Sequence, residues 1–291
     1  MPAQSPLVSV ILPCYNAHRF LAQTLESLRV QTFRDFETVV VNDGSTNPET
    51  LRFLGALPGD TRIVHQKNRG LSGARNTGFR EASGRFVLPL DCDDWIEPNF
   101  LEKFVAAIPS QEADNSFIFC HLVLEGDKAG VLSKQFNLFE QLFTNQLPYC
   151  LLMSKELWRR VGGYDEAMCQ GYEDWEFNIR IALSGARAVT VPEALFHYRV
   201  SSNGMLLSVS RKRHSKLWTF IQRKHSDAYR LGNLLRLWRI WHHKPSTHRL
   251  WYYPPLLAAH RLLPESAFQW IFRQAMRFSH SYRMKPNEPD R

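Results

Sequence analysis

The sequence predicts an α/β protein built on an open, doubly wound mixed sheet and followed by a helical C-terminal extension. Over the first two hundred residues, short apolar runs rich in β-branched residues alternate with amphipathic helical segments. Charge divides the chain as well: residues 1–210 hold 19 Lys/Arg against 24 Asp/Glu, whereas residues 211–291 hold 17 against 4. We therefore expect a slightly acidic main domain over 1–210 and a basic, aromatic-rich helical region over 211–291.

Two successive strand-helix-strand units account for the first half of the expected sheet. Residues 8–13 and 36–41 are β-branched runs of the length typical of buried parallel strands. Between them, Phe20, Leu21, Leu25 and Leu28 have helical spacing. A strand at 62–66, a helix at 71–82 and a strand at 85–90 repeat the pattern. This half resembles a Rossmann-like nucleotide-binding unit.

The alternation loosens after Asp94. We expect a helix near 98–108, a strand near 116–124, and a further strand and helix within 150–161. A helix opens in the segment GYEDWEF, buries Phe177, Ile181 and Ala182, and ends at Gly185. The segment AVTVPEALFHYR then returns to extended structure.

Length and composition fit one substantial core with an appendage. The chain has 291 residues, of which 44% are hydrophobic. Five cysteines, odd in number and never in a CxxC pair, argue against a disulfide framework or a zinc site and favour a reducing cytoplasm. The N-terminus lacks a basic segment before its short apolar run, so we expect no secretory signal. Nothing approaches the roughly 18 to 20 apolar residues of a membrane-spanning helix.

Distinctive polar segments follow each of the four expected parallel strands. In chain order they are CYNA, NDGST, KNRGLSGARN and DCDDW. In open α/β sheets ligands bind beyond the carboxyl ends of the strands. The four loops are therefore expected to converge on one site.

The acidic segment after the fourth strand predicts a metal site. Asp91, Asp93 and Asp94 crowd three carboxylates into four residues, which is costly without a cation. Asp91 and Asp93 share one side of an extended backbone, and their oxygen ligands suit Mg²⁺ or Mn²⁺ bridging two phosphates. The alternative is a solvated acidic turn.

The segments VSVILPCYN, VVVNDGS, NRGLSGARN, LDCDDW and YEDWE, in this order and spacing, resemble the inverting family 2 glycosyltransferases of the GT-A fold. The resemblance spans Val8 to Arg199. It implies transfer of a sugar from a nucleotide diphosphate sugar, most readily a UDP-sugar, to a hydroxyl of a glycan or lipid-linked glycan in bacterial cell-surface polysaccharide or glycolipid synthesis. It also implies Mn²⁺ or Mg²⁺ as cofactor, and an acceptor half after Asp94.

The resemblance assigns donor-binding roles to residues of the first four loops. Pro13 and Tyr15 match the loop that lines the nucleobase, Asp43 matches the carboxylate that accepts the pyrimidine N3 hydrogen, and Gly70 lets the backbone approach the ligand, as does Gly73. The full donor set is Pro13, Tyr15, Asn16, Asp43, Gly70, Arg75, Asp91 and Cys92. The competing interpretations are a tyrosine packing a turn, an Asx turn or helix cap at Asp43, and a surface arginine at position 75.

The resemblance also assigns the metal and the base. Asp93 matches the direct metal ligand, Asp91 supports ribose and metal, and His197 completes the metal site. Asp174 matches the general base that takes the proton of the acceptor hydroxyl, with Glu173 and Trp175 on the acceptor side. Alternatively, the acidic residues only oppose a helix dipole and His197 is structural.

The basic region from Arg211 interleaves cations with Trp, Leu and Phe. Leu217, Phe220 and Ile221 have helical spacing, as do Leu231, Leu234, Leu235, Trp238 and Trp241. This pattern is typical of a segment at a membrane interface, which predicts a peripheral location on the cytoplasmic face of a membrane. Packing against the main domain and a homodimer contact are the alternatives. Nucleic-acid binding is disfavoured because no recognised module accompanies the pattern.

Two other functional classes compete with sugar transfer. The first is a protein that has the same fold but only binds nucleotide sugars or nucleic acid, since a fold does not by itself imply catalysis. The presence of all the expected acidic residues argues against it. A nucleotidyltransferase would need a glycine-rich basic loop after the first strand, and CYNAHRF lacks one.

Overall fold

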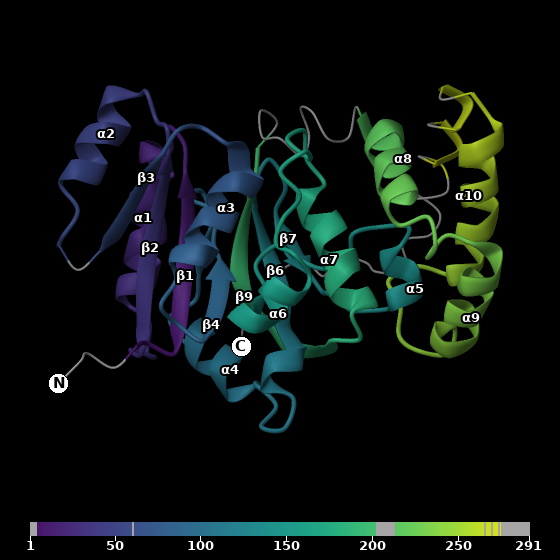
Figure 1. The fold of residues 1–291 in the computed structure, drawn as a ribbon, viewed down its shortest axis with the longest axis horizontal. Coiled ribbons are helices and arrows are strands. Elements are labelled where there is room, and N and C mark those ends of the chain that lie inside the picture. Colours follow the sequence, from purple (N-terminus) through teal and green to yellow (C-terminus); the bar gives the residue numbers. More distant parts are fainter. Residues whose placement is uncertain are drawn as a thin grey trace.

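The computed structural model describes residues 5–59, 61–201, 213–264, 266–268, 270–272 and 274. In this part of the chain one mixed sheet runs through the molecule in the order β3-β2-β1-β4-β8-β6-β9-β5, with β7 paired to β6 (Figure 1). The strands are β1 Val8–Cys14, β2 Phe36–Asp43, β3 Arg62–Gln66, β4 Phe86–Pro89, β5 Trp95–Ile96, β6 Ser116–Gly126, β7 Gly130–Leu132, β8 Leu152–Ser154 and β9 Arg187–Val200. The α/β class and the mixed sheet predicted from the sequence are confirmed.

The helices of the sheet-bearing part follow the predicted order. They are α1 His18–Arg29, α2 Pro48–Gly55, α3 Gly70–Glu81, α4 Phe100–Ala106, α5 Leu138–Gln141, α6 Lys155–Arg160 and α7 Glu173–Leu183, with a 3-10 turn η1 at Ala113–Asn115. The short helices α2 and α5 had no counterpart in the sequence prediction. Asn47 begins α2 by accepting the Thr50 backbone N–H at 2.9 Å, with Pro48 at the first helical position.

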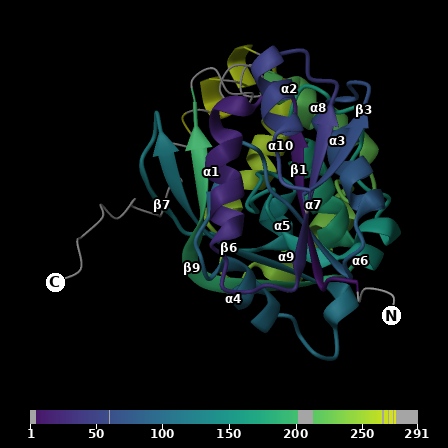
Figure 2. The ribbon, with the colours of Figure 1, turned by 90° about the vertical axis from the view of Figure 1, so that its left-hand side faces the viewer.

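The parallel half of the sheet is covered on both faces. β1 pairs in parallel with β2 and β4, and β2 pairs in parallel with β3. Successive side chains of a strand point to opposite faces, so Val10 and Leu12 pack in one core with Leu21 of α1, whereas Ile11 packs in a second core with Phe79 of α3. Figure 2 shows α1 and α3 on different sides of β1. This double cover explains why β1 and the end of β2 are buried without alternation.

The second half of the sheet brings the end of β9 back to the acidic loop. β8 is antiparallel to β4 and β6, while β9 runs parallel to β6, with an irregular register near Cys120 and His121. β5, directly after the acidic segment, pairs with β9 through Trp95 and His197. As a result, the residues that follow His197 lie beside Asp93 and Asp94.

The C-terminal helices pack against the second half of the sheet-bearing part (Figure 1). They are α8 His214–Lys224, α9 Leu231–Trp241, the 3-10 turn η4 Leu250–Tyr252 and α10 Tyr253–Leu262. Trp218 and Tyr253 share a buried core with Phe143 and with Trp175 of α7. The predicted alternative of packing against the main domain therefore describes the buried face of this region. No helix in the described residues has the length and apolarity needed to cross a bilayer.

Buried polar contacts reinforce this packing. Glu140 of α5 is fully buried and accepts the backbone N–H groups of Thr247 and His248 at 2.8 and 2.9 Å, and the Tyr253 hydroxyl at 2.8 Å. A buried carboxylate needs such donors to offset its lost hydration. One residue of α5 thus organises the turn that precedes α10.

Candidate active site

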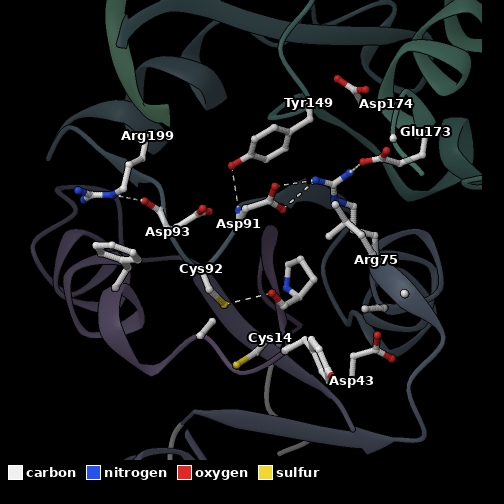
Figure 3. A pocket seen from close by; sticks show the side chains of 18 of the residues that line it. Cys14, Asp43, Arg75, Asp91, Cys92, Asp93, Tyr149, Glu173, Asp174 and Arg199 are labelled. Atoms are coloured by element: carbon white, nitrogen blue, oxygen red, sulfur yellow. Dashed lines mark hydrogen bonds and ion pairs between the residues drawn. The ribbon is translucent and has the colours of Figure 1, made fainter. Parts of the chain in front are cut away.

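A cavity of about 620 Å³ opens where the four parallel strands end. It is lined by residues from all four predicted loops, from the start of α7 and from the end of β9 (Figure 3). The predicted convergence of the four loops is therefore observed. Of the predicted site residues, the lining includes Pro13, Tyr15, Asn16, Asp43, Gly70, Arg75, Asp91, Cys92, Asp93, Glu173 and Asp174.

The first two loops form one wall of the cavity. Tyr15 is 51% exposed, so its ring is available for stacking. Asn16 adopts a left-handed conformation, with φ of 53°, and its Oδ1 accepts the backbone N–H groups of Thr46 and Asn47, both at 2.9 Å. The side chain of Asn16 therefore ties the two loops together.

Asp43 lies at the end of β2 and is 2% exposed. Its Oδ1 accepts both the side-chain amide of Gln66 at 2.6 Å and the backbone N–H of Arg69 at 2.8 Å. The Asx turn here uses a different residue, since the Ser45 backbone N–H bonds to Asn42 Oδ1 at 3.0 Å. Asp43 is thus fixed against the loop before α3, with its carboxylate at the cavity wall.

The two glycines of the third loop differ. Gly70 lines the cavity with φ of +73°, a conformation that favours glycine. At Gly73 an added Cβ would come within 2.5 Å of the Arg69 Cβ, so this glycine allows close packing of Arg69. Of the two glycines only Gly70 lines the cavity, and the close approach to a ligand stays a prediction.

Arg75 is a buried connector between the two halves of the site. Its side chain is 1% exposed, which contradicts the surface alternative. Nη2 donates to both oxygens of Asp91 at 2.8 Å, and Nη1 donates to Glu173 Oε1 at 3.0 Å. The guanidinium also lies over the rings of Tyr149 and Tyr164, with its Cζ 4.8 and 5.3 Å from their centroids. One cation thus joins the acidic segment to the start of α7.

The side chain of Tyr149 holds the acidic segment in place. The Asp91 backbone N–H donates to the Tyr149 hydroxyl oxygen at 3.0 Å, and this hydroxyl donates to Asp94 Oδ2 at 2.5 Å. Asp94 Oδ1 accepts the Arg199 backbone N–H at 2.7 Å. Burial, followed by the charge of Asp93, raises the pKa of Asp94. Asp94 therefore anchors the loop, and Asp91 and Asp93 face the cavity.

Cys92 lies between the two cavity-facing aspartates and is 4% exposed. Its Sγ is 3.1 Å from the Pro13 carbonyl oxygen, which links the fourth loop to the first. Cys92, which was predicted to bind the sugar donor, therefore contributes a buried side chain at the floor of the cavity.

No side chain among the described residues donates a hydrogen bond to the carboxylate of Asp93. It opens to the water of the cavity, but protein surrounds it on its other sides. This desolvation, followed by the charge of Asp91, raises the pKa of Asp93 to about 6. Arg199 bonds through Nε to the backbone carbonyl of Asp93 at 3.0 Å, whereas Arg75 neutralises Asp91.

This arrangement fits a divalent cation that takes most of its ligands from a substrate. No group of three or more His, Cys, Asp or Glu side chains that could hold a metal occurs among the described residues. Mg²⁺ is commonly bound by one or two carboxylates together with substrate phosphates. Asp93, with Asp91 beside it, has the chemistry for such a site.

The start of α7 forms the opposite wall. Tyr172 precedes the helix in a left-handed conformation, with φ of 63°. Burial and the neighbouring Asp174 raise the pKa of Glu173 to about 7, and burial raises the pKa of Asp174. Asp174 Oδ2 accepts the side-chain amide of Asn145 at 2.7 Å. A carboxylate with a raised pKa and a fixed position is a reasonable general base.

Two predicted site residues lie elsewhere. His197 is 7% exposed and stacked on Trp95, with ring centroids 3.4 Å apart. Its Nδ1 and Nε2 lie 2.9 Å from Glu125 and 2.8 Å from Glu97, and it does not line the cavity. The described geometry therefore contradicts a metal-ligand role for His197, because both ring nitrogens are already engaged.

Trp175 is also outside the cavity. It is 2% exposed, packs with the C-terminal helices, and donates through Nε1 to the Gln141 carbonyl at 2.7 Å. Its predicted place on the acceptor side is therefore wrong: helical geometry turns residue 175 away from the face that carries Asp174.

Three residues of the site were missed. Arg199 lies two positions after His197, so it belongs to the HYR segment that the sequence already indicated as part of the site. Tyr149 and Asn145 reach the site from the irregular stretch between α5 and β8. No periodicity or spacing in that stretch indicates a functional residue.

Comparison with known proteins agrees with this architecture. The profile of the family described as glycosyl transferase family 2 matches residues 9–169. The putative glycosyltransferase EpsH of Bacillus subtilis is 33% identical over 129 residues, which is 44% of this chain and 37% of EpsH. The chain thus spans little more than a third of the length of that relative.

Solved structures show the same fold. Staphylococcus aureus TarS 1-349 in complex with UDP-GlcNAc matches with a TM-score of 0.68 at 19% identity, covering 97% of this chain and 98% of that one. The mannosyltransferase PcManGT of Pyrobaculum calidifontis, solved with GDP-Man and Mn²⁺, matches with a TM-score of 0.59 at 21% identity, covering 94% and 81%. Together with the profile match over more than half of its length, these likenesses show that the chain belongs to glycosyltransferase family 2 and has the GT-A fold.

Proposed function

We propose that this protein transfers a sugar from a UDP-sugar to an acceptor hydroxyl, with inversion at the anomeric carbon. The observation that carries the proposal is that Asp93 and Asp174, far apart in the sequence, line one cavity of about 620 Å³. A cavity of that volume is within the range that holds a ligand of nucleotide-sugar size. The family membership supports the same reaction class.

The first two loops hold the nucleoside end of the donor in this proposal. The ring of Tyr15 stacks on the base. Both protein contacts of Asp43 use Oδ1, so Oδ2 is directed to accept the N3 hydrogen of uracil. Cytosine carries no hydrogen at N3, so the same carboxylate would repel it. TarS, which has the same fold, was solved with UDP-GlcNAc.

Asp93 would hold Mn²⁺ or Mg²⁺, with Asp91 contacting the ribose and supporting the metal. When bound, the cation neutralises the charge that collects on the diphosphate as it leaves. Arg75 keeps Asp91 oriented through two hydrogen bonds. The Mn²⁺ in the structure of PcManGT supports this choice of cofactor.

Asp174 acts as the general base. Its free carboxylate oxygen removes the proton of the acceptor hydroxyl while that oxygen bonds to the anomeric carbon, and the bond from that carbon to the diphosphate oxygen breaks. Attack from the face opposite the leaving group inverts the configuration. Asn145 holds the other oxygen of Asp174, and Glu173 lies beside it on the acceptor side.

The acceptor in this proposal is a hydroxyl of a glycan or lipid-linked glycan, handled at the cytoplasmic face of a membrane. The basic C-terminal region supports this location. The similar protein EpsH of Bacillus subtilis is a bacterial putative glycosyltransferase.

Titration calorimetry with UDP, with and without Mn²⁺, tests the donor site. We expect Mn²⁺ to strengthen UDP binding to the wild type by at least about tenfold, which corresponds to roughly 1.4 kcal/mol. In Asp93→Ala this enhancement should disappear, because the main protein ligand is lost.

Asp35→Ala is the matched control, since Asp35 is exposed and lies before β2, away from the cavity. It should keep the full Mn²⁺ effect. If Asp93→Ala bound UDP as the wild type does, and with the same Mn²⁺ effect, the assignment of Asp93 would be wrong.

A further inference from the structure

The C-terminal helices expose several large apolar side chains on adjacent elements. Leu231 and Leu235 of α9 are 73% and 50% exposed, Trp251 of η4 is 56% exposed, and Leu262 at the end of α10 is 80% exposed. Single exposed apolar residues are common on protein surfaces, but a cluster on adjacent elements marks an interaction site. Their buried neighbours already stabilise the fold, so these four contribute little to it.

An apolar groove of about 380 Å³ lies among these residues, between α9 and α10. Its floor contains Phe139, Phe143 and Tyr229. Its walls are Leu231, Leu234, Leu235 and Trp238 on one side, and Trp251, Pro254, Leu257, Ala258 and Arg261 on the other. The groove is therefore apolar throughout, except for the guanidinium of Arg261 and the Tyr229 hydroxyl, which bonds to the Leu142 carbonyl.

The charge around the groove has one sign. Residues 228–264 contain six Lys/Arg and no Asp or Glu. Five of the six, Arg236, Arg239, Lys244, Arg249 and Arg261, form no ion pair with any residue that the structure describes, whereas Arg230 pairs with Asp227. Several exposed arginines of the sheet-bearing part do have carboxylate partners, as in the pair between Arg85 and Asp114. Arg261 lines the groove itself, and the other unpaired cations lie on or next to the same elements, so this region is complementary to an anionic partner.

We propose that α9, η4 and α10 form a surface that docks on an anionic phospholipid bilayer, with the groove taking one acyl chain and Arg261 meeting a phosphate. Trp251 and Trp238 suit the headgroup level, where an aromatic ring has one apolar and one hydrated side. Each cation near an anionic bilayer contributes attraction that the acid-free stretch does not offset.

The same features disfavour two other partners. A second copy of the chain would bring two acid-free cationic faces together, and like charges across an interface oppose association. A nucleic acid would match the charge, but it would leave the aliphatic side chains of Leu231 and Leu262 without an apolar environment.

The groove is linked to the proposed catalytic base through α5 and the residues that follow it. Phe139 and Phe143 in the groove floor belong to the same short segment as Gln141 and Asn145. Gln141 donates to Asn145 Oδ1 at 3.1 Å, and Asn145 donates to Asp174. This part of the inference rests on the proposed function: a lipid-linked acceptor held at the surface would present its head group near Asp174.

Vesicle co-sedimentation of the full chain tests the proposal. We expect binding to vesicles of phosphatidylcholine mixed with an equal amount of phosphatidylglycerol, weak binding to phosphatidylcholine alone, and loss of binding at high salt. Arg236→Gln combined with Arg261→Gln should weaken binding about 25-fold, since each cation is worth about fivefold. Leu231→Ser combined with Leu235→Ser should weaken it at least about tenfold.

A matched control is available on α2, which lies at the opposite end of the molecule (Figure 1). Leu51 is 44% exposed there and Arg52 is also exposed, so Leu51→Ser combined with Arg52→Gln changes the same chemistry elsewhere. This variant should bind vesicles as the wild type does. All variants should bind UDP as the wild type does. This result would show that they are folded, and it tests the donor site separately from membrane binding.

Three results would overturn the proposal. They are equal binding to vesicles with and without phosphatidylglycerol, equal losses in the α2 control, and no vesicle binding at all. In the last case, dimerisation in gel filtration that the Leu231/Leu235 variant abolishes would identify a second copy as the partner. RNA binding that the Arg236/Arg261 variant abolishes would identify a nucleic acid.

Discussion

Arg75 is the residue on which the two walls of the active site depend. It is fully buried and bonds to Asp91 on one side and Glu173 on the other. A buried cation costs hydration free energy, and two carboxylates with two aromatic faces offset that cost. The same contacts keep both acidic residues in place.

Replacing Arg75 should therefore be severe. In Arg75→Met the buried Glu173 and the partly buried Asp91 lose their shared partner, so we expect the free energy of unfolding to fall by about 3 to 5 kcal/mol in urea titration. Arg85→Met is the comparison, because Arg85 pairs with Asp114 on the surface, and it should cost less than about 1 kcal/mol. Similar losses in the two variants would contradict the buried-connector role.

Asn145 should act as a positioning residue for Asp174. Its Oδ1 accepts side-chain amides of Gln141 and Asn178 at 3.1 and 3.2 Å, which fixes the direction in which its Nδ2 donates to Asp174. In Asn145→Leu we expect kcat to fall about 10- to 100-fold with little change in the KM of the donor, because only the base loses its support.

The pH profile of the same variant separates positioning from general damage. The hydrogen bond from Asn145 lowers the pKa of Asp174, against the larger effect of burial. Without it the pKa rises, so the acid limb of kcat should move to higher pH. Asn145→Ser, which can still donate, should recover part of the rate. An unchanged profile in Asn145→Leu would show that the contact is only structural.

For single residues, sequence motifs correctly place those at the ends of strands, but they do not decide which of two adjacent residues within a strand faces the site. Asp43, Asp91 and Asp93 lie at or just after the carboxyl ends of parallel strands. Because these ends meet at one edge of the sheet, the position of each aspartate in the sequence was sufficient to place it at the site. His197 and Tyr198 are adjacent in β9, and only Tyr198 lines the cavity. Side chains alternate along a strand, so an error of one position moves a residue to the opposite face.

At the scale of elements, α7 is held between the active site and α8. Glu176 is fully buried, one turn after Glu173. Burial alone would raise its pKa, but hydrogen bonds from His225 and Arg180 outweigh it and lower the pKa of Glu176 to about 2. His225 directly follows α8, so the C-terminal region supports the helix that presents Asp174.

Packing of α8 should make stability depend on pH. Burial, followed by the charge of His260, lowers the pKa of His214 to about 4 from the ordinary 6.5. Between these values the unfolded chain binds a proton that the folded chain does not, so acidification favours unfolding. This residue should reduce stability by up to about 1.4 kcal/mol for each pH unit as pH falls from 6.5 towards 4.

Urea titrations between pH 7 and pH 4.5 would measure this effect. The ring centroids of His214 and Phe272 are 4.3 Å apart. His214→Phe keeps a ring for this stacking and removes the titrating group. Its stability should fall less over this range than that of the wild type. His243→Gln controls for the loss of one exposed imidazole. Parallel curves for wild type and His214→Phe would contradict the prediction.

At the scale of the whole molecule, the sequence predicts the sheet and its site better than the parts that complete them. The main buried strands have continuous apolar runs and the long helices have periodic apolar patterns, and both signals predict these elements correctly. The short α5 and the stretch to Tyr149 have no such pattern, because long-range contacts place them, such as the bonds from Glu140 to Thr247 and His248. For the same reason the sequence left open which face of the C-terminal helices is buried. Whether residues 1–210 and 211–291 form separate domains stays a prediction.

In the proposed reaction, one cavity combines a metal-supported donor site with Asp174 as the base. The most direct test is the rate of UDP release from a panel of UDP-sugars with Mn²⁺ and a glycan acceptor, for wild type, Asp174→Asn and the exposed control Asp35→Asn. We predict acceptor-dependent release for the wild type and the control, and a loss of about 10²- to 10⁴-fold in kcat for Asp174→Asn with UDP binding retained. Full activity of Asp174→Asn, or no release by the wild type from any UDP-sugar, would contradict the account.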